Sequence, residues 1–307
     1  MTRRLLLAAI TATSVMSGTW AFTSAGVLRA QNPPATFRAG ADSVSVDVSV
    51  RQRGRPVTGL TAADFELLDN GVPQPISDVS FEKLPVDVTI ALDVSDSVSG
   101  PVVEQLRRAV HQLEQDITAR DRIRLVTFNL RISRLMDFGP GGSATDAAFA
   151  KIQPFGGTAV FDTIAVLLAG PTPPDRRQLL VVFTDGEDSN SVSEPSVVLD
   201  VARRTTPTLS VVLSRLGTAG LPPQTRGAAA REQLNTQLAR ETGGVVESLG
   251  LTANLSSSFR RMLEEFRSSY VLHFAPSRAG AVGFHSLDVK VNRPGVDVRA
   301  RRGYTLR

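Results

Sequence analysis

Strand-like and helix-like hydrophobic patterns alternate through the middle of the chain. Residues 86–92 and 179–183 are almost continuously apolar, as expected for strands that are buried on both faces of a sheet. Further strands are predicted over residues 122–128, 132–136, 209–213 and 245–246, and helices over residues 102–117, 144–152, 159–168, 195–204, 228–241 and 253–267. This alternation predicts an α/β fold with a doubly wound, mostly parallel sheet and helices on both of its faces.

The two flanks of this region show only strand-like patterns. Before it, residues 44–50 alternate apolar and polar positions, residues 65–71 run into an Asn-Gly turn, and residues 75–81 suggest a third strand. After it, strands are predicted over residues 270–274, 284–291 and 296–304. Each flank is too small to form a stable sheet alone, so we expect the two flanks to pair into one accessory β domain. The predicted organisation is an α/β domain over residues 84–268 and an accessory β domain built from residues 41–83 and 269–307.

The first 30 residues are typical of a signal peptide. Arg3 and Arg4 precede an apolar stretch that is diluted by Ser, Thr and Gly, and small residues suited to cleavage follow at Ala25 and Ala30. Residues 31–40 contain two prolines and are interpreted as a linker. A retained membrane anchor is the alternative. No later apolar run approaches 18 residues, so no stable membrane insertion is expected after cleavage. We therefore expect an exported protein.

Composition narrows the function classes. The 307-residue chain carries a net charge of +4, but residues 1–30 hold three arginines and no acid, which leaves +1 for the remainder. A nearly neutral chain with one Trp and two Tyr lacks the basic field and the stacking surface of a nucleic-acid-binding protein. The absence of cysteine excludes disulfides, thiolate metal sites and cysteine nucleophiles.

The C-terminal arginines suggest a surface role. Arg299 and Arg301 are expected to share one face of the predicted strand over residues 296–304, with Arg302 and Arg307 close by. Charges in this position protect a sheet edge and maintain solubility. Contact with an acidic partner is the alternative.

Three polar segments stand just beyond predicted secondary-structure elements. Asp93, Ser95 and Ser97 follow the strand that ends at residue 92, Thr158 lies at the start of a helix after two glycines, and Asp185 follows the strand that ends at residue 183. In doubly wound sheets, ligands bind at the carboxyl ends of strands where the strand order reverses. Taken singly, these segments have ordinary explanations as helix caps and turns. Together and in this order they predict one shared site.

The predicted site is a hard-metal site. Two carboxylates and three hydroxyls suit Mg²⁺, with Mn²⁺ and Ca²⁺ as alternatives, and do not suit zinc or copper. Two negative charges nearly neutralise a divalent cation, and a shell with few protein carboxylates leaves a position for an external ligand. A carboxylate from another molecule would complete the shell.

The runs VTIALDVSDSVSG, GGTAVFDTI and LLVVFTDGEDSNS resemble the von Willebrand factor type A domain with a metal ion-dependent adhesion site. The resemblance covers roughly residues 84–270 and implies a Rossmann-like fold. It implies that Asp93, Ser95, Ser97, Thr158 and Asp185 hold the metal, some of them through water, and that the Asp or Glu of a protein partner completes the shell. The flanking segments resemble a bacterial exported subgroup of this family, which implies a periplasmic or secreted protein.

Three functions are compatible with these residues. The leading hypothesis is a non-enzymatic, metal-dependent module that binds a protein partner. A metal-dependent hydrolase of phosphate or ester substrates is the alternative from another class, with Asp93 as its nucleophile. The chain has no glycine-rich phosphate loop and few lysines near the site, which disfavours this alternative. A scaffold whose metal only braces the three loops is the third hypothesis.

Overall fold

The computed structural model describes residues 43–306, except residues 82, 99, 215–227, 251–253 and 277–281. The predicted signal peptide and linker, residues 1–40, lie outside the described part of the chain. Within the described part, no helix has both the length and the apolar character needed to cross a membrane.

A six-stranded sheet forms the centre of the α/β region. Its strand order is β11-β10-β9-β6-β7-β8, and all neighbours are parallel except β8, which runs antiparallel to β7. The strands are β6 (Val86–Asp93), β7 (Arg122–Phe128), β8 (Ile132–Gly139), β9 (Arg177–Thr184), β10 (Thr208–Ser214) and β11 (Val246–Leu249). Every residue of β6 is buried, which agrees with its continuous apolar pattern and its central position.

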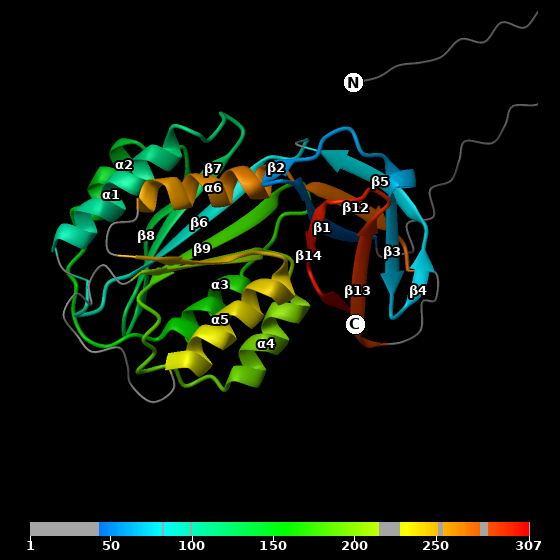
Figure 1. Ribbon diagram of the computed structural model, residues 1–307. Helices are drawn as coiled ribbons and strands as arrows, with labels where there is room; N and C mark the ends of the chain where they lie inside the picture. The colour runs from blue at the N-terminus through cyan, green and yellow to red at the C-terminus, as the bar shows by residue number, and fades with distance from the viewer. Residues whose placement is uncertain are drawn as a thin grey trace, which may run out of the picture. The chain divides into compact units, whose positions relative to one another are not determined.

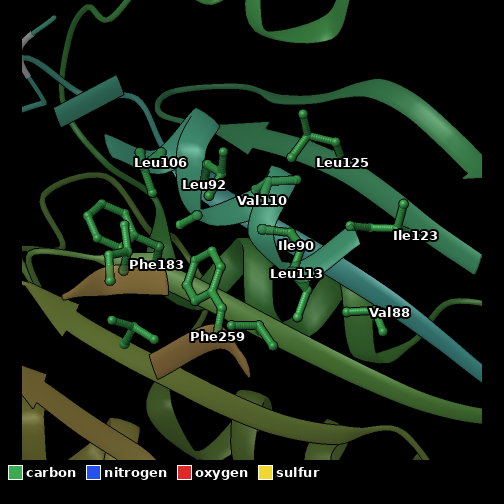
Figure 2. Close-up of a cluster of buried hydrophobic side chains, with 14 of the residues drawn as sticks. Val88, Ile90, Leu92, Leu106, Val110, Leu113, Ile123, Leu125, Phe183 and Phe259 are labelled. Carbon is green, nitrogen blue, oxygen red and sulfur yellow. The ribbon is translucent and has the colours of Figure 1, made fainter. Parts of the chain in front are cut away.

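Six helices cover the two faces of this sheet (Figure 1). They are α1 (Gly100–Glu114), α2 (Ser143–Phe149), α3 (Val160–Leu168), α4 (Pro195–Arg204), α5 (Ala228–Thr242) and α6 (Leu255–Arg267). One core packs α1, α2 and α6 against the sheet, and Figure 2 shows Leu106 and Phe259 from two of these helices meeting Ile90 and Phe183 of the strands. A second core packs α3, α4 and α5 against the opposite face. The helices follow the predicted segments closely because their apolar positions recur at helical spacing.

The flanking segments pair with each other in two further sheets. The first has the order β14-β1-β12-β5 with β2 attached to β1, and the second has the order β15-β13-β3-β4. The strands are β1 (Val44–Gln52), β2 (Arg55–Pro56), β3 (Phe65–Asp69), β4 (Val72–Gln74), β5 (Ile76–Phe81), β12 (Tyr270–Phe274), β13 (Gly283–Val291), β14 (Asp297–Ala300) and β15 (Gly303–Leu306). A third apolar core, which includes Val48, Leu67, Leu272 and Leu287, joins the two sheets.

The prediction of one strand over residues 296–304 is wrong. The chain leaves the first sheet after Ala300 and enters the second at Gly303, because β14 pairs with β1 whereas β15 pairs with β13. Arg301 at this crossing is only 6% exposed, so it does not protect a sheet edge as predicted. Its guanidinium donates hydrogen bonds to the carbonyls of Ala202 and Thr205 at the end of α4. A cation in this position stabilises the carboxyl end of a helix.

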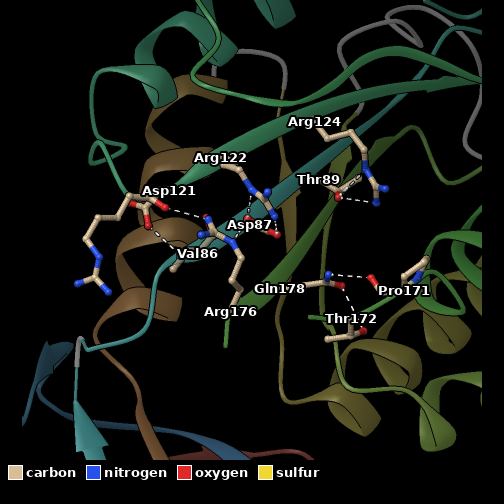
Figure 3. A network of polar contacts seen from close by, with 11 residues as sticks. Val86, Asp87, Thr89, Asp121, Arg122, Arg124, Pro171, Thr172, Arg176 and Gln178 are labelled. Atoms are coloured by element: carbon tan, nitrogen blue, oxygen red, sulfur yellow. Dashed lines mark hydrogen bonds and ion pairs between the residues drawn. The ribbon is translucent and has the colours of Figure 1, made fainter. Parts of the chain in front are cut away.

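Arginines neutralise a buried acid at the amino ends of the central strands. Asp87 of β6 is fully buried. Arg122 Nε and Nη2 donate to its two carboxylate oxygens at 2.9 and 2.6 Å, and Arg176 Nε donates to Oδ1 at 2.5 Å. Figure 3 shows both guanidinium groups directed at this carboxylate. The buried negative charge at this end of the sheet is therefore balanced by arginines of the protein itself.

Replacing Asp87 with Asn should lower the free energy of unfolding by about 2–4 kcal/mol, because two arginines lose their charged partner in a partly buried site. Arg122 is 40% exposed, which moderates the loss. The control is Asp137→Asn, which removes an exposed pair with Arg134 and should cost less than about 1 kcal/mol. Urea denaturation of the three proteins measures the difference. Equal losses in the two variants would contradict this account of the network.

Candidate metal centre

The carboxyl ends of β6 and β9 lie side by side at the point where the strand order reverses. From β6 the chain passes through α1 to β7 on one side, and it later returns to β9 on the other side. Asp93 is the last residue of β6, and Thr184 is the last residue of β9. Ligands bind at such a reversal in doubly wound sheets because the connecting loops diverge there.

The first loop folds around the carboxylate of Asp93. The backbone N–H and the hydroxyl of Ser95 donate to Asp93 Oδ1 at 3.0 and 2.7 Å, and the hydroxyls of Ser95 and Ser97 are 3.1 Å apart. Asp93 and Ser95 are buried, and Ser97 is partly exposed. The alternation in Asp-x-Ser-x-Ser thus gathers three oxygen-bearing side chains in one hydrogen-bonded group.

Three hydrogen bonds join the second loop to the first. The N–H of Asp96 donates to the carbonyl of Gly156 at 3.0 Å, and the N–H of Gly156 donates to Asp96 Oδ1 at 2.9 Å. The N–H of Phe155 donates to the carbonyl of Val94. Gly156 has φ +74, which glycine adopts without the steric cost of a Cβ atom. Thr158, buried to 3% exposure, follows two residues later.

The third loop is bonded to the second. The backbone carbonyl of Thr158 accepts from the N–H groups of Ser189 and Asn190, and its own N–H donates to Ser189 Oγ at 3.0 Å. Gly157 leaves room for this close approach: a Cβ atom there would lie 2.2 Å from Asn190 Oδ1, so the Asn190 side chain would have to move. Asp185, the predicted carboxylate of this loop, is partly exposed. The structure therefore brings all three predicted segments to one end of the sheet.

The pKa of Asp93 is raised to about 6, chiefly because the carboxylate is buried. The nearby negative charge of Asp185 acts in the same direction, whereas hydrogen bonds from Ser95 and Thr184 lower the pKa. In contrast to Asp87, Asp93 accepts no hydrogen bond from a cation within the described part of the chain. The carboxylates of Asp93 and Asp185 thus form one negatively charged centre. A divalent cation would satisfy this charge.

Three further residues support the centre through contacts that the sequence did not identify. Thr184 donates its hydroxyl to Asp93 Oδ2 at 2.7 Å and so orients the carboxylate from the neighbouring strand. Asp96 fixes the second loop through Gly156. Asp188, close to Asp185 in the chain, accepts from the N–H of Val160 at the start of α3. Each acts on a residue far away in the sequence, so spacing within one motif gave no signal.

The donor set is unlike that of a site built from acids and histidines. Among the described residues, no group of three or more His, Asp or Glu side chains is placed to hold a metal ion. The candidate centre instead combines the carboxylates of Asp93 and Asp185 with the hydroxyls of serine and threonine. Such a set matches the preference of Mg²⁺ for hard oxygen ligands and retained waters.

Comparisons with known proteins agree with the fold. The family model of the von Willebrand factor type A domain matches residues 87–235. Inter-alpha-trypsin inhibitor heavy chain H4 of Homo sapiens is 26% identical over 133 residues, which cover 39% of this chain and 14% of that protein. A von Willebrand factor A domain-containing protein of Dictyostelium discoideum is 22% identical over 181 residues, which cover 56% of this chain and 18% of that protein. The match thus spans less than a fifth of either relative.

A solved structure with a similar arrangement is that of BatB, a conserved hypothetical protein from Bacteroides thetaiotaomicron. It has 18% sequence identity and a TM-score of 0.47, and the alignment covers 59% of this chain and 98% of that chain. The match of the family model spans strands β6 to β10 and the three loops that meet at Asp93. Residues 87–235 of the chain are thus similar to the von Willebrand factor type A domain.

Proposed function

We propose that the protein is an exported, metal-dependent binding module. In this proposal Asp93, Ser95, Ser97, Thr158 and Asp185 hold one Mg²⁺ ion, directly or through water, and a carboxylate of a protein partner completes its shell. The observation that carries the proposal is the buried carboxylate of Asp93, which lies beside Asp185 without a cationic partner in the described chain. The family is generally one of protein-interaction modules, which supports the same conclusion.

The protein groups fit a divalent cation in charge and in chemistry. Two carboxylates balance the two charges of the ion, and the hydroxyls add neutral oxygen ligands. The hydrogen bonds of Ser95 and Thr184 hold the Asp93 carboxylate in one orientation. The proposal needs the ion for its open coordination position, which an oxygen of the partner's carboxylate fills.

Binding accounts for the site better than hydrolysis does. Hydrolysis would need an acid or base within reach of a substrate at Asp93. The three histidines of the chain make other contacts: His111 pairs with Glu114 and Asp146, His273 with Ser45, and His285 with Asp69. A site with two carboxylates and hydroxyls is sufficient for coordination alone.

Export is part of the proposal and rests on the sequence. Arg3, Arg4 and the apolar stretch that follows have the composition of a signal peptide. An exported domain without cysteine has no disulfides, so its stability must come from its cores and, in this proposal, from the bound metal.

The first test is metal binding. Mg²⁺ in hundredfold excess over its Kd should stabilise the protein by about 2.7 kcal/mol and raise Tm by roughly 5–10 °C. Asp185→Ala should abolish the rise, because one of the two metal-binding carboxylates is lost. Asp200→Ala, which removes an exposed acid from α4, should keep it. Calorimetry in Mg²⁺ and in EDTA measures the effect. A rise that persists in Asp185→Ala would place the ion elsewhere.

The second test is partner binding. Proteins captured from the secreted or envelope fraction by the wild type in Mg²⁺ should be absent from captures in EDTA and from captures by Asp185→Ala. Mass spectrometry with purified Asp200→Ala as the control identifies the specific set. A partner that binds equally in EDTA would contradict the adhesive role. If Mg²⁺ raises Tm but the partner binds equally in Mg²⁺ and in EDTA, the role of the metal is only structural.

The third test uses pH. Because the pKa of folded Asp93 is about 6 and its usual value is 3.8, its contribution to the stability of the metal-free protein is fully present below pH 4. The contribution is lost as pH rises through 6. In EDTA, Asp93→Asn should therefore gain stability relative to the wild type as pH rises from about 4 to about 7, by up to roughly 3 kcal/mol in total. Urea denaturation at several pH values measures this difference. If the difference in free energy of unfolding between the two proteins does not change with pH, the pKa of Asp93 is not raised by folding.

A further inference from the structure

Exposed apolar side chains gather at the end of the sheet that carries the candidate metal centre. Within the described part of the chain, eight large apolar residues are exposed, and four belong to segments at this end: Leu130, Ile132, Phe155 and Val192. Single exposed apolar residues are ordinary on protein surfaces. A group of them beside a polar site is a mark of an interaction surface.

Three of these residues lie in two adjoining segments, and we call them the apolar shelf: Leu130, Ile132 and Phe155. Leu130 lies in the turn between β7 and β8, and Ile132 is the first residue of β8. Asn129, in the same turn, donates its amide to the carbonyl of Phe155 at 3.1 Å. Leu130, Ile132 and Phe155 are 50%, 39% and 51% exposed, so each offers apolar area that a partner can bury.

The shelf is in direct contact with the loops of the metal centre. A Cβ atom placed on Gly156 would lie 3.2 Å from Leu130 Cδ1, so the Leu130 side chain covers this glycine. Gly156 in turn exchanges two hydrogen bonds with Asp96, which lies between Ser95 and Ser97. A segment whose carboxylate reaches the metal therefore passes close to the shelf.

The charge beside the shelf favours an acidic segment. Arg131 lies between Leu130 and Ile132 and is exposed. Within the described residues its side chain forms no ion pair, whereas Arg231, the arginine next to the third loop, is paired with Glu187. A positive charge in this position attracts the acidic residues of an approaching partner and repels basic ones.

We propose that the apolar shelf binds an aromatic or large aliphatic side chain that lies next to the metal-binding carboxylate in the partner. This inference rests on the proposed function, because the carboxylate anchors the segment. A metal–carboxylate contact alone does not distinguish one acidic segment from another. Burial of a neighbouring apolar side chain supplies that selectivity, since apolar anchors near the centre of an interface dominate its energy.

The test is selection of peptides from a random phage-displayed library on the purified chain in Mg²⁺. The expected peptides carry Asp or Glu with Phe, Tyr, Trp, Leu or Ile within two positions. The shelf variant Leu130→Ser/Phe155→Ser should select acids without an apolar neighbour. It should also bind a synthetic peptide selected by the wild type at least about tenfold more weakly.

The matched control is Val166→Ser/Val197→Ser, which removes two apolar side chains of 55% and 52% exposure from α3 and α4. This control should select and bind as the wild type does, and equal Tm values should show that both variants fold. If the wild type selects acidic peptides with no preference for a neighbouring apolar residue, or if the shelf variant binds the selected peptide as the wild type does, the proposed role of the shelf is wrong. Either result would leave the proposed metal site unaffected. Selected peptides that lack acids, or that bind equally in EDTA, would overturn the proposed function itself.

Discussion

The structure depends on how it accommodates a buried carboxylate at each end of its central strand. Asp87 and Asp93 both belong to β6, and both are 0% exposed. A buried charge without compensation is costly, so each needs a partner. Asp87 has two arginines, which close the amino end of the sheet with the protein's own charges. Asp93 has only hydroxyl and amide donors, and Asp185 adds a second negative charge.

This asymmetry assigns a role to each end of the sheet. The amino end has a structural role. It carries the arginine network around Asp87, and the α/β region contacts the flanking sheets there. Arg177, for example, starts β9, donates to Asp47 of β1, and reaches the backbone carbonyl of Phe266 in α6. The carboxyl end, where we propose that the partner binds, has three loops, an incomplete charge balance and exposed apolar side chains. A fixed scaffold with variable loops is the usual arrangement of function on such sheets.

Local sequence patterns predicted the central elements well. The continuous apolar run over residues 86–92 is β6, and the helical spacing over residues 159–168 is α3, because one buried face per element fixes the period. The prediction of one strand over residues 296–304 failed because the alternation of apolar and polar residues continues through the point where the chain passes from one sheet to the other. Only the buried environment of Arg301, formed by the distant end of α4, marks that crossing.

The positions of the candidate site residues followed from motif order, but their supporting contacts did not. Thr184 reads as the polar end of an apolar strand, and its bond to Asp93 joins residues 91 positions apart. Exposure of Leu130 and Phe155 is also invisible in the sequence, since apolar residues in short loops are buried as often as not. Such features depend on tertiary packing, which no local pattern records.

The most direct test of the central claim is an anomalous difference map from a crystal of the protein grown with Mn²⁺. The account predicts one strong peak beside the oxygens of Asp93, Ser95 and Ser97, on the side of Thr158 and Asp185. A map with no peak at these residues, or with the peak at another group of side chains, would contradict it.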